Sequence, residues 1–336
     1  MAGWELKSGE LKNLNPSEDE MWASFNFVFS DASKKRNTYK FGLIKAILDN
    51  LFDAIPQPFS DAMEYFISYD LIFTKFAGNY WNLITKYHLH QMRQSTTSQY
   101  SEIEQVFMKA AAERPEVAEL EFDSLEEHSR NNLISYISQN CRKYVLGALY
   151  EDLNGMVYSF DLKGQGIFIS NVAYGFLSRF KMELEKLNYY SWAKFLEKIN
   201  DDAALVRVID KLDLATPVRS DLSIYRLVLQ KEFEEDCCFY CGKKLTGTAA
   251  VDHVIPWSFV KTDNLWNFVL CCQSCNSKKN NKLPDRGVVE RLLKRNEAAK
   301  KIEDPFVITQ FKSYSPERFQ KLCRYAAYSG YRTITI

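Results

Sequence analysis

The chain has 336 residues, of which 46% are hydrophobic, and its 43 Lys and Arg balance its 43 Asp and Glu. This length predicts two domains, and the apolar content argues against a chain that is disordered over most of its length. With 13 Gly and 9 Pro, collagen-like, low-complexity and turn-dense all-β chains are also disfavoured. The composition therefore favours globular domains built mainly from helices.

The charges are distributed unevenly along the chain. Residues 237–336 contain 17 Lys and Arg against 8 Asp and Glu, a net charge of +9, whereas residues 1–236 have a net charge of −9. A basic C-terminal third can meet the phosphates of a nucleic acid, and a solvated basic surface would produce the same count. Charge alone leaves both interpretations open.

The first two hundred residues predict a mainly helical domain. Helical patterns cover residues 41–51, 73–87, 133–149 and 172–199. They are interrupted by two predicted short strands, Met156–Leu162 and Ile167–Ser170, around the Gly-containing turn Lys163–Gly166. We interpret the basic run Lys34–Arg36 as a solvated face. No Gly-rich phosphate loop is present, so the sequence of this region does not indicate a ligand.

A linker is predicted around Asp201, Asp202 and Ala215–Pro217. We therefore expect a mainly helical recognition or regulatory domain over residues 1–215 and a second domain over residues 216–336. The N-terminal residues show no export or import signal, and no stretch approaches the roughly 18 apolar residues that cross a bilayer. We expect a cytoplasmic protein with no membrane partner.

Six of the eight cysteines fall between residues 237 and 275. Four of them form two C-x2-C pairs separated by thirty residues: Cys238, Cys241, Cys272 and Cys275. Two such pairs predict a tetrahedral zinc site, because each pair supplies two of the four thiolates. A closed four-thiolate site is structural. Cys237 and Cys271 have the wrong spacing, and we expect them to be small buried residues.

The residues around the second cysteine pair follow a recognisable order. Val251–Ser258 (VDHVIPWS) and Asn264–Leu270 (NLWNFVL) precede the pair, and Cys275–Lys279 (CNSKK) contains its last cysteine. An Asp-His pair is thus followed by a proline three residues after the histidine and by asparagines fourteen and twenty-three residues after it. This order resembles the ββα-metal domain of HNH endonucleases.

The resemblance covers the core segment 238–284. It is especially close to the HNH domain of RNA-guided CRISPR effectors, although those lack the paired cysteines. Asn276 stands where many HNH proteins have a third histidine, which resembles the HNN subtype and implies a magnesium-preferring site.

The residue patterns themselves predict the local structure of this segment. Residues 249–253 and 268–271 predict two paired strands, and residues 273–279 predict a helix across them. We therefore expect an α+β protein. A mostly α-helical N-terminal domain would be followed by a small zinc-stabilised ββα-metal (HNH) nuclease domain with flanking helices.

Hydrolysis of a phosphodiester needs a proton acceptor for the attacking water and positive charge for the phosphate and the leaving oxygen. His253, the only histidine of the C-terminal third, can accept the proton as a neutral imidazole. Asp252 and Asn276 offer oxygen ligands for a catalytic Mg²⁺ or Mn²⁺. The resemblance implies that Asn267 holds the loop that orients the imidazole.

Three lysines, Lys278, Lys279 and Lys282, follow Asn276 on the same helix or just beyond it. They are candidate phosphate contacts, and the alternative for each is a solvated helix end.

The sequence therefore predicts a metal-dependent HNH endonuclease that hydrolyses DNA, with RNA not excluded. The alternative is a non-catalytic zinc module that binds nucleic acid or protein. The joint presence of Asp252, His253, Asn267 and Asn276 favours the enzyme. The resemblance implies a prokaryotic restriction or antiphage-defence nuclease whose N-terminal domain senses or recognises. Both a homo-oligomer and a partner protein of a defence system are left open.

Overall fold

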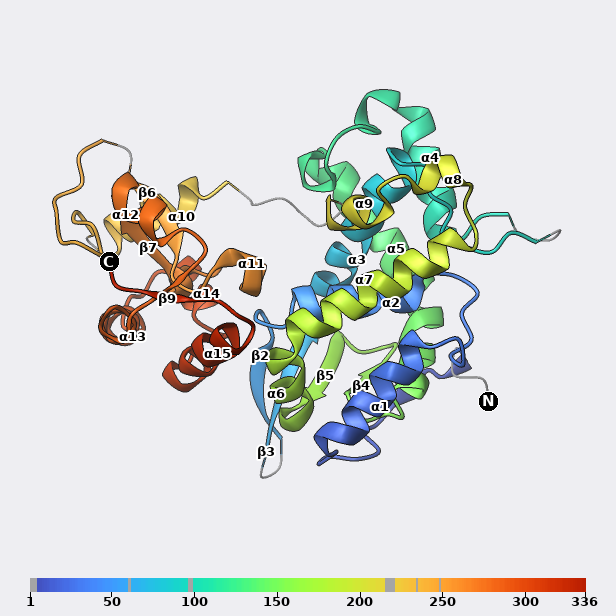
Figure 1. The fold of residues 1–336 in the computed structure, drawn as a ribbon, viewed down its shortest axis with the longest axis horizontal. Helices are drawn as coiled ribbons and strands as arrows, with labels where there is room; N and C mark the ends of the chain where they lie inside the picture. The colour runs from blue at the N-terminus through green and yellow to red at the C-terminus, as the bar shows by residue number, and fades with distance from the viewer. Residues whose placement is uncertain (1–4, 60–61, 96–98, 215–220, 234, 248) are drawn as a thin grey trace. The chain divides into compact units, whose positions relative to one another are not determined.

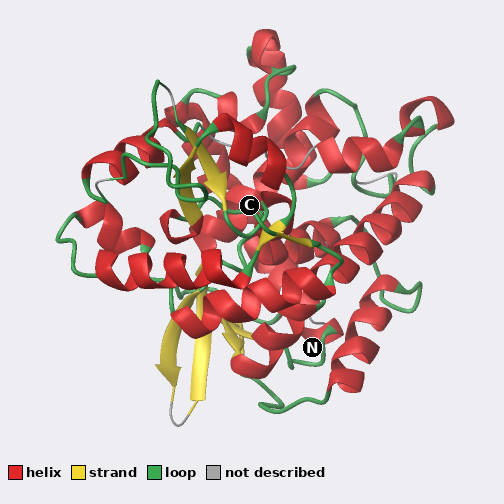
Figure 2. Ribbon diagram, turned by 60° about the vertical axis from the view of Figure 1, so that its left-hand side comes forward, coloured by secondary structure: helices red, strands yellow, loops and turns green. Residues whose placement is uncertain are grey.

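The computed structural model describes residues 5–59, 62–95, 99–214, 221–233, 235–247 and 249–336 (Figure 1). The chain divides into two compact units. The N-terminal unit comprises residues 1–177 and 181–218, and the C-terminal unit comprises residues 178–180 and 219–336. Helices predominate and the strands are short (Figure 2), so the predicted α+β class is confirmed. The expected linker at Ala215–Pro217 lies outside the described residues.

The N-terminal unit contains a five-stranded antiparallel sheet with the strand order β1-β4-β5-β3-β2. The strands are β1 Ser8–Gly9, β2 Ile55–Phe59, β3 Ala62–Ser68, β4 Tyr158–Asp161 and β5 Gly166–Ser170. The hairpin β4–β5 is the one that the sequence predicted. β2 and β3 were not predicted from the sequence, and β2 contains Pro56 and Pro58, which are unusual in a strand. Prolines are tolerated there because β2 is an edge strand, where a missing NH group breaks no ladder.

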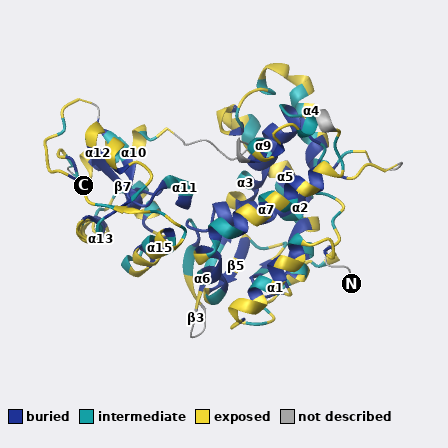
Figure 3. Cartoon of the chain, in the orientation of Figure 1, coloured by how far each residue is buried: buried dark blue, intermediate teal, exposed yellow. Residues whose placement is uncertain are grey.

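Nine α-helices are described in the N-terminal unit. They are α1 Glu18–Phe29, α2 Tyr39–Asp49, α3 Tyr69–Thr85, α4 Glu102–Glu113, α5 Glu127–Asp152, α6 Asn171–Arg179, α7 Lys181–Glu197, α8 Asp202–Leu205 and α9 Val208–Leu214. The predicted helical patterns at residues 41–51, 73–87 and 133–149 overlap α2, α3 and α5, and the pattern at 172–199 covers α6 and α7. The core is centred on α3, whose Phe73, Phe76, Tyr80 and Trp81 are fully buried (Figure 3).

The C-terminal unit contains the strand–strand–helix arrangement expected for residues 249–279. Its elements are α10 Ser223–Lys231, β6 Ala250–His253, α11 Trp257–Val260, β7 Phe268–Cys271, α12 Gln273–Lys279, β8 Leu283–Pro284, α13 Arg286–Ala299, α14 Pro305–Gln310, α15 Pro316–Tyr328 and β9 Thr333–Ile334. β6 and β7 pair antiparallel, with His253 opposite Phe268, and β8 pairs in parallel with β9.

The helices that follow α12 complete the core of this unit. Trp266, 1% exposed, contacts the ring of Phe319 from α15 edge-on at a centroid distance of 5.9 Å. The side chain of Asn296 in α13 donates to the Trp266 carbonyl at 2.8 Å. A ββα segment is too small to bury a core by itself, so these C-terminal helices supply the apolar cover that it needs.

An ion pair connects α13 to the beginning of the segment. Arg295 Nη1 lies 2.8 Å from Glu235 Oε1 and donates to the Phe268 carbonyl at 2.6 Å. Glu235 Oε2 in turn accepts the backbone NH of Leu270 at 3.0 Å. The chain entering the first cysteine pair is thereby held against β7.

Among the described residues, no helix has both the length and the apolar content to cross a membrane.

Candidate active site and metal centre

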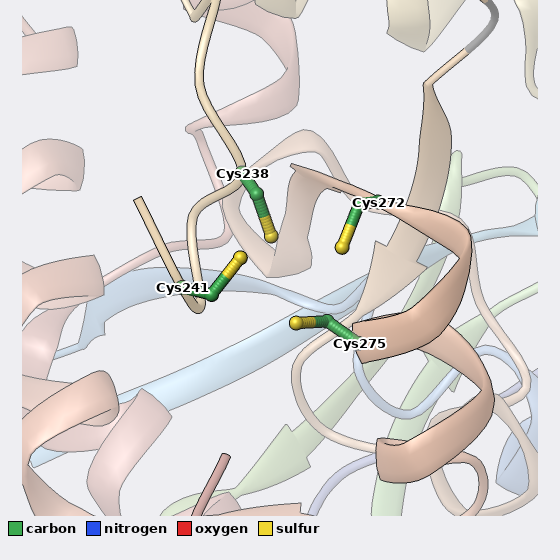
Figure 4. A group of neighbouring side chains, drawn as sticks. All are labelled: Cys238, Cys241, Cys272 and Cys275. Carbon is green, nitrogen blue, oxygen red and sulfur yellow. The ribbon is translucent and has the colours of Figure 1, made fainter. Parts of the chain in front are cut away.

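The four predicted zinc ligands meet at one point. The Sγ atoms of Cys238, Cys241, Cys272 and Cys275 all lie within 4.8 Å of one another. Figure 4 shows the two sulfurs of the first pair facing the two sulfurs carried by the start of α12. A tetrahedral zinc with bonds of about 2.3 Å separates its sulfur ligands by about 3.8 Å, so a small inward shift of the side chains completes the site. This cluster has the donor set for a structural zinc ion.

The backbone of the first pair forms a tight turn. Gly242 has a φ of +73°, a conformation that L-residues rarely adopt, and its NH donates to the Cys238 carbonyl at 2.8 Å. The Phe239 NH donates to the Leu270 carbonyl at 2.9 Å, which ties the turn to β7. Of the two cysteines expected to be buried, Cys271 is buried, whereas Cys237 is exposed. The expectation for Cys237 was wrong because it precedes the turn on the outside of the unit.

The protonation of the thiols is consistent with a metal centre. Burial opposes the thiolate of Cys238, but hydrogen bonds from backbone amides, of which that of Cys241 contributes most, lower its pKa to about 7. Burial raises the pKa of Cys275 above the ordinary thiol value. A bound cation is therefore needed to hold all four groups as thiolates at neutral pH.

His253 ends β6 and is 5% exposed. Its Nε2 lies 2.8 Å from Asp263 Oδ1, and its ring stands edge-on to Phe268 at 4.4 Å between centroids. Asp263 is itself held in place, because Tyr225 of α10 donates its hydroxyl to the Asp263 carbonyl at 2.8 Å. The imidazole thus has a carboxylate partner and a fixed orientation.

Asp263 was not among the site residues expected from the sequence. It lies in the loop between α11 and β7, ten residues after His253, and it is the only carboxylate in that loop. Its position could have identified it, because Asp263 is a single acidic residue in the short loop that leads from α11 back to β7, beside His253.

Asn267 lies at the end of the loop between α11 and β7, and its side chain hydrogen-bonds to the backbone that follows His253. It is 1% exposed, its Oδ1 accepts the Ile255 NH at 2.8 Å, and its Nδ2 donates to the Ile255 carbonyl at 2.9 Å. The Asn267 carbonyl also accepts the Val254 NH at 2.9 Å. An amide side chain that satisfies both polar groups of one residue fixes the path of the backbone that follows His253.

Asp252 is nearly buried and has two polar neighbours. Its Oδ2 accepts the hydroxyl of Tyr240 at 2.5 Å and lies 3.1 Å from Lys279 Nζ. Burial, followed by the charge of Asp252, raises the pKa of Tyr240 well above its ordinary value, so the phenol stays protonated as a donor. The Asp252 carboxylate is thereby fixed by Tyr240 and Lys279, one residue before His253 on β6.

Lys279 corrects one expectation from the sequence. It is 0% exposed, and its ammonium donates to the His253 carbonyl at 2.6 Å in addition to pairing with Asp252. A side chain buried in this way cannot reach a nucleic-acid phosphate. Its neighbours differ: Lys278 is exposed and Lys282 is partly exposed. Residue 279 points inward because it lies four residues after Cys275 on the same helix face.

Asn276 is partly exposed and follows Cys275 directly on α12. It lies three residues before Lys279, and positions three apart share a helix face. Lys279 reaches Asp252 and the carbonyl of His253, so α12, which carries Asn276, packs beside the end of β6. The structure therefore brings Asp252, His253, Asn267 and Asp263 together, with Asn276 on the adjoining helix.

Residues 238–285 match the family model of HNH endonucleases. The matched segment contains the cysteine cluster together with His253 and Asp263, so the resemblance predicted for residues 238–284 is confirmed. No curated protein and no solved structure matched the chain. A domain of this family indicates a nuclease that acts on nucleic acid.

Proposed function

We propose that this protein is a metal-dependent endonuclease that hydrolyses DNA phosphodiester bonds at the end of β6. The observation that carries the proposal is the partly buried pair of His253 Nε2 and Asp263 Oδ1 at 2.8 Å, within a segment that contains Asp252 and matches HNH endonucleases. A histidine held by a carboxylate beside hard oxygen donors is suited to activating a water.

His253 acts as the general base in this proposal. Donation of its Nε2–H to Asp263 places the lone pair that accepts a proton on Nδ1. The carboxylate then stabilises the imidazolium that forms when the water loses its proton. Asn267 fixes the backbone after His253, so the ring is oriented before the substrate arrives.

Asp252 and Asn276 are the residues that would hold Mg²⁺ or Mn²⁺. Carboxylate and amide oxygens suit either ion, and the bound ion would neutralise the scissile phosphate and stabilise the leaving oxygen. Lys279 holds the Asp252 carboxylate in place through Oδ2. The cysteine cluster, loaded with zinc, would fix the start of α12 and with it the position of Asn276.

The DNA contacts are proposed for the exposed basic residues of α12, its C-terminal continuation and α13. Lys278 is exposed and Lys282 partly exposed, and both would meet the backbone near the scissile phosphate. Arg286, Arg291 and Lys294 on α13 are also exposed. They account for part of the net charge of +9 over residues 237–336.

We further propose, on the family resemblance, a restriction or antiphage-defence role in the cytoplasm. Residues 1–215 would recognise or regulate, and residues 216–336 would cleave. The alternative of a zinc module that only binds nucleic acid or protein assigns no role to the pairing of His253 with Asp263. Cleavage therefore separates the two functions.

The test is incubation of the full chain with supercoiled plasmid and Mg²⁺ or Mn²⁺, in parallel with a structured RNA. We expect the wild-type protein to produce nicked or linear DNA and EDTA to prevent this cleavage. His253→Ala should cleave far more slowly than wild type. His128→Ala, at an exposed histidine of the N-terminal unit, should cleave as wild type does. Binding of DNA without cleavage under any of these metals would favour the non-catalytic module. Cleavage of RNA alone would correct the substrate.

A further inference from the structure

The N-terminal unit contains a cavity of about 680 Å³ with a strongly basic lining. It is formed by the segment that follows α1, by Arg93 and by the end of α7. Six of its described lining residues are basic, namely Lys34, Lys35, Arg36, Arg93, Lys194 and Lys198, and Asp31 is the acidic one. Residues 1–236 have a net charge of −9, so this concentration of cations is not a consequence of composition.

Two arginines of the lining are brought side by side by the backbone. Asn37 and Met92 form an antiparallel bridge, and the Arg93 NH donates to the Arg36 carbonyl at 3.2 Å. Both arginine side chains are exposed and both line the cavity. A guanidinium group binds phosphate oxygens through two parallel N–H donors, so adjacent arginines form a receptor for a phosphorylated group.

Hydrogen bonds from lysine side chains to backbone carbonyls fix the conformation of the segment that contains Lys34, Lys35 and Arg36. Lys35 Nζ donates to the Ser30 carbonyl at 2.8 Å and to the Ser33 carbonyl at 3.2 Å. Lys40 Nζ donates to the Lys34 carbonyl at 3.2 Å. A receptor whose loop is already ordered loses less entropy when a ligand binds.

Carboxylates compensate only part of the charge of the basic lining, with Asp31 acting on Lys198, Lys35 and Arg93. Lys198 pairs with Asp31 at 2.9 Å and Lys194 with Glu197 at 3.0 Å. Within the part of the chain that the structure describes, no carboxylate pairs with Lys34, Arg36 or Arg93. Six basic groups around one acidic group in the lining still repel one another, and a bound anion relieves that repulsion.

We propose that this cavity binds a phosphorylated ligand of nucleotide size, with Arg36 and Arg93 as its principal phosphate contacts. Small-molecule sites have volumes of about 300–1,000 Å³, which includes this one. A hollow of this volume suits a compact ligand, whereas a nucleic-acid backbone is followed by an extended basic stripe. Tyr190 in the lining is 60% exposed, and its ring is available to stack on a base. The proposal does not depend on the nuclease function.

The test is isothermal titration calorimetry of the full chain with ATP and, separately, with inorganic triphosphate. We expect both to bind, and the double variant Arg36→Gln/Arg93→Gln to weaken both by about a hundredfold or more, since each arginine makes charge-assisted contacts. Lys194→Gln should weaken both less. Lys186→Gln is the matched control, because Lys186 is also exposed on α7 and lies outside the lining.

Further variants distinguish the parts of the ligand. Tyr190→Ala should weaken ATP and leave inorganic triphosphate unchanged, because only ATP has a base to stack. Arg36→Lys/Arg93→Lys keeps the charge and should bind more weakly than wild type but more tightly than the glutamine variant. Circular dichroism of each variant checks the fold.

The proposal is overturned if neither probe binds at about 1 mM, a concentration at which even weak sites are occupied. It is also overturned if the arginine variants bind as wild type does. Binding of a single-stranded oligonucleotide through Arg36 and Arg93, with no displacement by ATP or triphosphate, would instead assign the cavity to a nucleic-acid backbone.

Discussion

Lys279 Nζ lies 3.1 Å from Asp252 Oδ2 inside the C-terminal unit, where the two side chains are only 1% and 11% exposed. The same ammonium donates to the carbonyl of His253 at 2.6 Å. The Lys279 ammonium therefore compensates the negative charge of Asp252. It also holds the backbone of His253, the proposed general base. The structure and the proposed chemistry of the site depend on this pair together.

Lys279→Met should destabilise the C-terminal unit by about 3–5 kcal/mol, because it leaves Asp252 buried without its cation. Lys278→Met is the control, since Lys278 is exposed and its loss should change stability by about 0.5 kcal/mol or less. Urea denaturation monitored by tryptophan fluorescence measures both. Adding Asp252→Asn to Lys279→Met should recover part of the loss. Equal effects of the two lysine variants would contradict a buried ion pair.

Cys238→Ser should abolish zinc binding and leave the C-terminal unit sensitive to proteases, because metal binding supplies folding free energy to a site of this kind. Cys237→Ser is a closely matched control, since the adjacent thiol is exposed and does not belong to the cluster. Metal analysis of the purified proteins and limited proteolysis decide the matter. Retention of zinc by Cys238→Ser would refute the assignment of the four cysteines.

His253→Ala should lower single-turnover cleavage by about two to four orders of magnitude, the effect of a positioned general base. Zinc content and DNA affinity should stay near the wild-type values. Asn276→Ala should instead weaken the binding of the catalytic metal, so that raising Mg²⁺ recovers part of its activity. Near wild-type cleavage by His253→Ala would show that another group deprotonates the water.

Asp263→Asn should lower cleavage by about ten- to a hundredfold while leaving KM for DNA unchanged, because Asp263 orients the imidazole and does not touch the substrate. In the His253→Ala background the same change should have no further effect, since the two residues act as one unit. Glu303→Gln, at an exposed carboxylate of the same unit, is the control. Additive losses in the double variant would mean that Asp263 acts independently of His253.

The affinity of the N-terminal cavity for ATP should fall as the pH rises through about 8. Burial, and after it the charge of Lys40, lowers the pKa of Lys35 from 10.5 to about 8. Asp152 and Asp31 raise it and Lys198 lowers it further, and these are the charged groups that face Lys35. Below its pKa Lys35 is a cation that attracts phosphate, and above its pKa it is neutral. Lys35→Arg stays charged throughout, so its affinity should not change with pH.

Short-range patterns predicted much of the C-terminal unit. The strands at Ala250–His253 and Phe268–Cys271 and the helix at Gln273–Lys279 lie where their residue patterns placed them. The two C-x2-C pairs predicted the cluster as well, because the spacing within each pair dictates which way its thiols can face. These features depend on neighbours along the chain.

The sheet of the N-terminal unit could be predicted only in part. The hairpin β4–β5 joins residues that are close in sequence, and the Gly-containing turn between them is recognisable from the sequence. The pairing of β3 with β5 joins Tyr65 to Ile169, about a hundred residues away, and no local pattern indicates such a partner. The prolines of β2 are compatible with a strand because β2 lies at the edge of the sheet, and this position is known only from the fold.

Residue types alone identified the groups that could do chemistry: four thiols, one histidine, and the oxygen donors beside it. The folded chain was needed to show that Asp263 meets His253, that Lys279 turns inward to Asp252, and that Arg36 lies beside Arg93. The reason is physical. A side chain's type is a local property, whereas its burial and its partner depend on the path of every loop and the face that each helix turns to its neighbours, and these depend on the packing of the whole unit.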